Sequence, residues 1–172
     1  MRERYRQAME RLYLACVVVS GAALVAMTLA IPYGVFMRYV MGDPAGWPEP
    51  FAILMMVLFT FVGGAAVYRA NLHVAVMALV DAVNERTRAA MLATVNLCLA
   101  GASLFMLVWG TQLVRTTWDQ SIPDFPGLSV GLTYTPIPLA GLMTLLFLVE
   151  RVWLGDPPRS SLMYTDEPRD LQ

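Results

Sequence analysis

The charged and aromatic side chains that could do chemistry gather in RYVMGDPAGWPEPF, residues 38–51, between two long apolar runs. Arg38 could form an ion pair with Asp43 or Glu49, or bind a lipid phosphate, and simple snorkelling of its side chain is an equal alternative. Trp47 has the position of an aromatic anchor at the membrane surface. Glu49 precedes the second apolar run and could face the N-terminal dipole of that helix. The stretch therefore predicts a structural loop more strongly than a substrate site.

The remaining chemistry-bearing residues are too few for several classes of membrane enzyme and carrier. His73 is the only histidine, so the paired haem ligands of a four-helix b-type cytochrome are missing. Cys16 and Cys98 both lie in apolar runs, which predicts packing residues instead of a reactive pair, a disulfide or a metal site. The middles of the apolar runs carry no charge, although autonomous carriers usually place charges or broken helices there. We therefore expect no enzyme, catalytic residue, cofactor or metal, and favour a partner subunit.

Composition and the lengths of the apolar runs predict an all-α membrane protein. Hydrophobic residues make up 58% of the 172 residues and charged residues 15%, well below the roughly 25% of soluble domains. Because about 20 helical residues cross a bilayer, we expect four transmembrane helices at about 12–37, 51–68, 88–116 and 136–154. Thr135 and Pro136 predict the start of the fourth helix, as N-cap and first helical residue.

Outside these spans the sequence predicts three lesser segments. Residues 71–83 show a short apolar helical face, which predicts a cytoplasmic interfacial helix. Residues 119–134 mix prolines and glycines with apolar side chains and predict an irregular outer loop. A single four-helix domain would then occupy 1–155, followed by a polar, disordered tail at 156–172.

The distribution of arginine predicts the orientation in the membrane. All twelve cationic residues are arginines. With four spans, both termini and the connection between the second and third spans share one side, which holds ten of them. The other side holds only Arg38 and Arg115, so the positive-inside rule places both termini in the cytoplasm. The net charge of −1 gives no indication of nucleic acid as a partner.

Residues 38–76 resemble the small, DctQ-type membrane subunit of tripartite ATP-independent periplasmic (TRAP) transporters. The matching features are Arg38 and Tyr39 at the end of the first span, Trp47 and Glu49 before the second, small residues at 63–66, Arg69, and His73 followed by Val74. The four-span layout extends the resemblance over about 10–155. The family often has a second acidic residue where this chain has Pro50, so a role of that carboxylate is not carried over.

The resemblance implies a small permease subunit in the bacterial inner membrane. Such a subunit packs as a scaffold against a large membrane subunit, which takes up an organic acid with sodium after a periplasmic substrate-binding protein has captured it. The expected partners are these two proteins and membrane lipids, with no nucleic acid. The alternative is a stand-alone small membrane protein, either a homo-oligomeric carrier or an assembly factor.

Eight residues are expected to have interface or structural roles: Arg38, Tyr39, Trp47, Glu49, Gly63, Gly64, Arg69 and His73. Arg38 and Glu49 would tie two helix ends together. Gly63 and Gly64 would permit close helix approach, either within this chain or with the partner.

Overall fold

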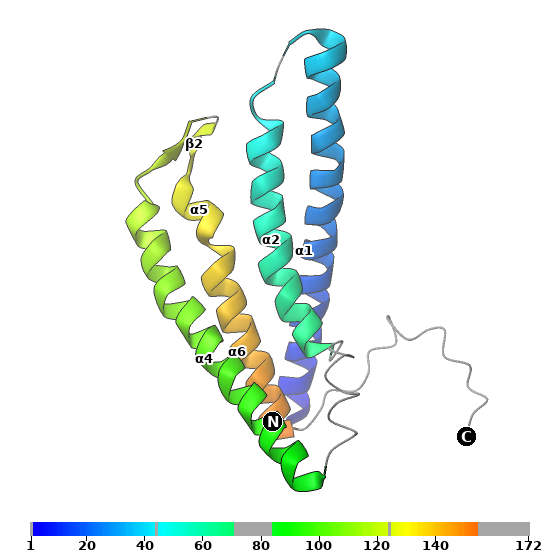
Figure 1. Cartoon of the computed structure of the whole chain (residues 1–172), viewed down its shortest axis with the longest axis vertical. Helices are drawn as coiled ribbons and strands as arrows, with labels where there is room; N and C mark the ends of the chain where they lie inside the picture. The colour runs from blue at the N-terminus through cyan, green and yellow to red at the C-terminus, as the bar shows by residue number, and fades with distance from the viewer. Residues whose placement is uncertain (1, 44, 71–83, 124, 155–172) are drawn as a thin grey trace, which may run out of the picture.

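The fold consists of two antiparallel pairs of long helices, as seen in a computed structural model of the chain (Figure 1). The structure describes residues 2–43, 45–70, 84–123 and 125–154. The first pair is α1 (Arg2–Phe36) and α2 (Pro48–Arg69), and the second is α4 (Glu85–Thr117) and α6 (Pro136–Leu154). All four are long and apolar enough to cross a membrane, which confirms the predicted all-α class with four transmembrane helices. The segments predicted as an interfacial helix and a tail, 71–83 and 156–172, lie outside the described residues.

Short elements connect the members of each pair at one end of the bundle, termed the loop end (Figure 1). The π-helical turn η1 (Met37–Met41) continues α1 and ends at Gly42, whose left-handed backbone (φ 70°) suits a residue without a Cβ atom. The strands β1 (Ser121–Ile122) and β2 (Phe125–Ser129) pair antiparallel after α4, where the sequence predicts an irregular loop. The short helix α5 (Val130–Tyr134) then leads to α6.

α6 begins at Pro136 as the sequence predicts, because a proline at the first helical position loses no hydrogen bond. The prediction of Thr135 as an N-cap is wrong. Thr135 has helical dihedral angles at the end of α5, and its hydroxyl donates to the Gly131 carbonyl at 3.1 Å. The Leu139 N–H donates to the Thr135 carbonyl, so α6 follows α5 with little interruption of the helical backbone.

Glycines allow close approach between the helices of each pair. A Cβ atom at Gly141 of α6 would lie 2.7 Å from the Ser103 carbonyl oxygen of α4, closer than real Cβ contacts. A Cβ atom at Gly63 of α2 would lie 3.3 Å from Ser20 Oγ of α1. Gly64 has open space around its missing Cβ atom. Of the two glycines that the sequence indicates, therefore, only Gly63 serves packing within this chain.

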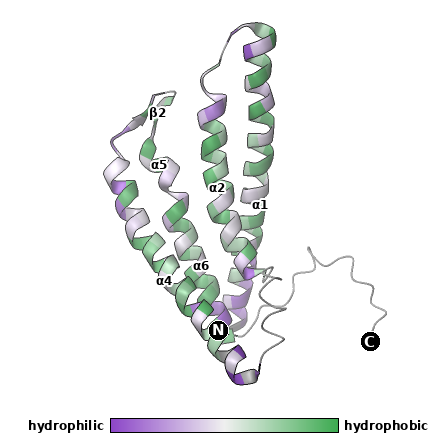
Figure 2. Cartoon of the chain, in the orientation of Figure 1, coloured by the Kyte–Doolittle hydropathy of each residue, from purple (hydrophilic) through white to green (hydrophobic). Residues whose placement is uncertain are grey.

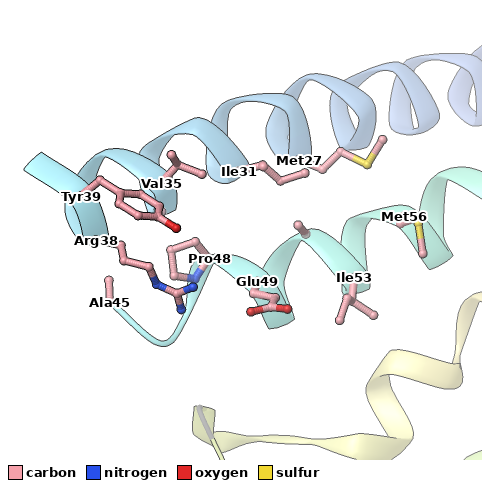
Figure 3. Close-up of a pocket in the computed structure, with 12 residues that line it drawn as sticks. Met27, Ile31, Val35, Arg38, Tyr39, Ala45, Pro48, Glu49, Ile53 and Met56 are labelled. Carbon is pink, nitrogen blue, oxygen red and sulfur yellow. The ribbon is translucent and has the colours of Figure 1, made fainter. Parts of the chain in front are cut away.

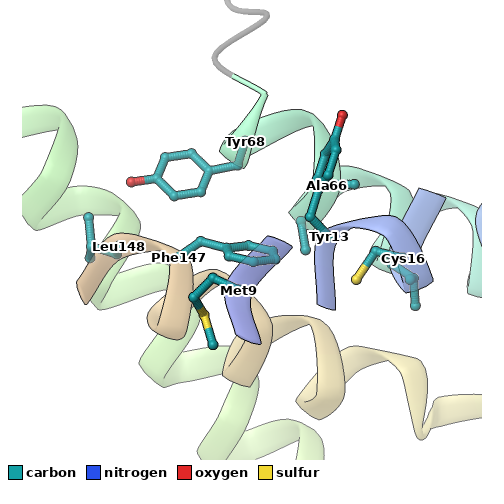
Figure 4. Close-up of a cluster of buried hydrophobic side chains, with 9 residues drawn as sticks. Met9, Tyr13, Cys16, Ala66, Tyr68, Phe147 and Leu148 are labelled. Carbon is teal, nitrogen blue, oxygen red and sulfur yellow. The ribbon is translucent and has the colours of Figure 1, made fainter. Parts of the chain in front are cut away.

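The buried apolar core lies where the two pairs meet, at the end of the bundle opposite the loop end (Figure 4). It consists of Met9, Tyr13 and Cys16 from α1, Val62, Ala65, Ala66 and Tyr68 from α2, and Phe147 and Leu148 from α6. The two pairs separate toward the loop end (Figure 1). Figure 2 shows that hydrophobic residues continue along all four helices outside this core.

The two cysteines lie in different surroundings. Cys16 is buried, with its Sγ atom 3.5 Å from Met143 Sδ, which agrees with the predicted packing role. Cys98 is exposed on α4. Contacts within this chain therefore do not supply the packing role predicted for Cys98, because its side chain lies on an exposed face of α4.

Candidate functional site

Three charged side chains from three helices meet beside the core, at the end opposite the loop end. Arg69, in the last turn of α2, donates from Nε and Nη2 to the two carboxylate oxygens of Glu150 in α6, at 2.8 and 3.0 Å. Its Nη1 donates to Glu10 Oε2 of α1 at 2.8 Å. The side chains of Arg69 and Glu150 are 4% and 2% exposed, and that of Glu10 is 39% exposed. This charge cluster connects α2 to both α1 and α6.

Aromatic rings cover the guanidinium group of the charge cluster. Arg69 Cζ lies 5.2 Å from the ring centroid of Tyr13 and 5.6 Å from that of Phe147, within the range of cation–π contacts. A planar guanidinium can present a two-pronged donor set to one carboxylate and its face to a ring, which an ammonium cannot do. Because all three guanidinium nitrogens have carboxylate partners, the charge cluster is suited to a structural role, in which it holds the three helices together.

The sequence indicates Arg69 but not its partners. Glu150 and Glu10 lie 81 and 59 residues away along the chain, so no local spacing joins the three. The one available signal is that an arginine and two glutamates lie near the ends of three apolar runs, on the side of the membrane that holds most of the arginines. From that signal the contacts among the three residues can be inferred only when the packing of the helix pairs is known.

A groove of about 560 Å³ lies at the loop end between α1 and α2 (Figure 3). Arg38, Tyr39 and Glu49 all line this loop-end groove. The Arg38 guanidinium lies within 4.0 Å of neither the Asp43 nor the Glu49 carboxylate. The direct tie expected between Arg38 and Glu49 is therefore not formed; the two charges instead share one groove.

Trp47 packs the α1–α2 connection against both helices. Its ring centroid lies 5.4 Å from that of Tyr33 in α1 and 6.0 Å from that of Phe51 in α2. A Cβ atom at Gly34 would lie 3.0 Å from Pro48 Cβ, so the two backbones approach closely here. The loop is thus held by aromatic and backbone packing. Tyr33 and Gly34 were not predictable as contacts of the loop from their position in a uniform apolar run.

Among the residues predicted for structural or interface roles, the charged and aromatic ones that the structure describes fall at two ends of the bundle. Arg38, Tyr39, Trp47 and Glu49 are at the loop end, whereas Arg69 belongs to the charge cluster at the other end. His73 lies outside the described residues, and its role stays a prediction.

Comparison with protein families matches residues 27–156 to the family described as "Tripartite ATP-independent periplasmic transporters, DctQ component". The matched range includes the loop-end groove, Arg69 and Glu150, whereas Glu10 precedes it. Comparison with curated proteins gives no match.

Proposed function

Because the chain belongs to the DctQ component family of TRAP transporters, we propose that it is a small permease subunit that serves as scaffold for a large membrane subunit. The family match confirms the resemblance found in residues 38–76. In this proposal a periplasmic binding protein delivers an organic acid, and the large subunit carries it inward with sodium. A family of transporter components also supports a role without catalysis.

The observation that supports the scaffold role is the apolar surface that the helices leave uncovered. On α4, Leu97, Phe105 and Trp109 are 74%, 56% and 56% exposed, and the Phe105 and Trp109 rings stack at 4.7 Å. Transmembrane helices associate through van der Waals packing of such surfaces. The charged residues of the cluster bond to one another. The bundle can therefore present this apolar flank to another membrane protein without rearranging its buried charges.

Reconstitution in liposomes tests whether transport requires the large subunit or can be carried out by this chain alone. We expect liposomes that contain this chain alone to take up no organic acid under an inward sodium gradient. The reason is that the buried charged residues that the structure describes, Arg69 and Glu150, are bonded to each other and not open to a ligand. Adding the large subunit and the binding protein should give sodium-dependent uptake. The probe is the labelled carboxylate, from a panel of mono- and dicarboxylates, that most raises the melting temperature of the binding protein.

The control liposomes contain the large subunit and binding protein without this chain, and their uptake should be strongly reduced. Sodium-dependent accumulation by the isolated chain would contradict the scaffold proposal. It would favour the alternative of a homo-oligomeric carrier.

Reporter fusions test the orientation. We propose that both termini are cytoplasmic, because ten of the twelve arginines lie on their side of a four-span layout. Alkaline phosphatase should be active when fused after Gly46 and inactive when fused after Leu171, with green fluorescent protein giving the reverse result. Reports of the same side from both positions would contradict the four-span orientation.

A further inference from the structure

The lining of the loop-end groove changes from apolar to charged toward the loop end (Figure 3). In this direction the lining residues are Met27, Ile31 and Arg38 on α1 and η1, and Met56, Ile53 and Glu49 on α2. One leaflet of a bilayer has the same gradient, with hydrocarbon inside and polar headgroups at the surface. The groove therefore matches the polarity of a lipid molecule from end to end.

The length of the groove matches one leaflet as well. Arg38 follows Met27 by eleven positions along the chain, which corresponds to about 16 Å at the helical rise per residue. Half of the hydrocarbon core of a bilayer measures roughly 15 Å. An acyl chain whose headgroup lies beside Arg38 would thus reach the methionines at the deep end.

The two charges at the mouth of the groove are available to a ligand. Arg38 and Glu49 are exposed and are not paired with each other, although both line the groove. The guanidinium group presents N–H donors in the geometry that binds phosphate. The carboxylate accepts hydrogen bonds from a primary ammonium group and repels a headgroup that carries negative charge alone. A headgroup with both a phosphate and an ammonium group satisfies both residues.

We propose that the loop-end groove binds one phosphatidylethanolamine-type phospholipid from the leaflet at the loop end. Its phosphate lies at Arg38, its ammonium group at Glu49, and one acyl chain lies along Ile31 and Ile53 toward the methionines. This inference does not rest on the proposed transport function, because the groove is formed by α1, η1 and α2 of this chain alone.

Native mass spectrometry of the delipidated full-length chain tests the site. Palmitoyl-oleoyl phosphatidylethanolamine and the matching phosphatidylglycerol are added in equal amounts. We expect one retained phosphatidylethanolamine per chain and about tenfold preference for it, because one charge-assisted hydrogen bond distinguishes the headgroups. Arg38→Gln should reduce the retention of both lipids about tenfold. Glu49→Gln should remove the preference without reducing phosphatidylglycerol retention, and Ile53→Trp should reduce the retention of both lipids by filling the groove.

Arg115→Gln is the matched control, since it removes an exposed arginine in the last turn of α4, outside the groove. It should leave lipid retention unchanged. Arg38, Glu49 and Ile53 are also exposed, so all four variants should melt at the temperature of the parent chain. An equal loss of lipid in Arg115→Gln, or equal retention of both lipids by every variant, would overturn the proposal. Release of phosphatidylethanolamine when the large subunit binds would also overturn it and would assign the groove to protein docking.

Discussion

Arg69→Gln is expected to lower the melting temperature of the detergent-solubilised chain by about 10 °C, because removing one partner of a buried ion pair costs several kcal/mol. The substitution leaves the Glu150 side chain, 2% exposed, without its guanidinium partner. It also removes the bond from α2 to Glu10 of α1. Thermal unfolding followed by tryptophan fluorescence and near-ultraviolet circular dichroism measures the loss.

A double-mutant cycle separates the ion pair from general damage. Glu150→Gln should destabilise the chain comparably, and the double variant with Arg69→Gln should lose less than the two single losses combined, because no unpaired charge stays buried. Arg69→Lys should be intermediate, since it keeps the charge but not the two parallel N–H donors. Arg115→Gln, at an exposed position, is the control and should not change the melting temperature. Strictly additive losses would contradict a direct pair.

Gly141→Leu should have the second largest effect. The new Cβ atom would lie 2.7 Å from the Ser103 carbonyl oxygen and 3.0 Å from the Leu107 nitrogen, which are backbone atoms of α4. Overpacking of this kind costs about 1–3 kcal/mol in soluble cores, and backbone atoms cannot move aside as a side chain can. We therefore expect a loss at the upper end of that range, measured by the same thermal unfolding.

Gly64→Leu is the matched control for Gly141→Leu, because the space around Gly64 is open and leucine is a better helix former than glycine. It should leave the melting temperature of the isolated chain unchanged or slightly raised. Equal losses at the two glycines would mean that α4 and α6 do not approach each other as closely as described.

The helices could be predicted from the sequence because the thickness of a bilayer sets the length of an apolar run. The polar ends of the helices could not be predicted in this way. α1 begins at Arg2 although the span was expected from about residue 12, since a helix can continue beyond the hydrocarbon, where hydropathy carries no signal. The β1–β2 hairpin was missed for a related reason: its five-residue strand contains a proline and a glycine, which in sequence indicate a turn.

The sites were predictable only where neighbours in sequence are neighbours in space. The short connection between α1 and α2 brings Arg38 and Glu49 to the same groove, as local spacing indicates. Their expected ion pair is not formed, and the two charges line the same groove without bonding to each other. The contact of Arg69 with Glu10 and Glu150 depends on how one helix pair packs against the other, which the sequence of a single apolar run does not encode.

The charge cluster has a consequence for the biogenesis of the chain. Translation proceeds from the N terminus, so Glu10 and Arg69 reach the membrane before Glu150 has been synthesised. Until α6 inserts, the Nε and Nη2 donors of Arg69 lack the carboxylate that they bind in the finished fold. Insertion of α6, the last span, therefore supplies the carboxylate that completes the neutralisation of Arg69 on α2, the second span. A chain truncated before α6 would therefore keep the Nε and Nη2 donors of Arg69 without the carboxylate of Glu150.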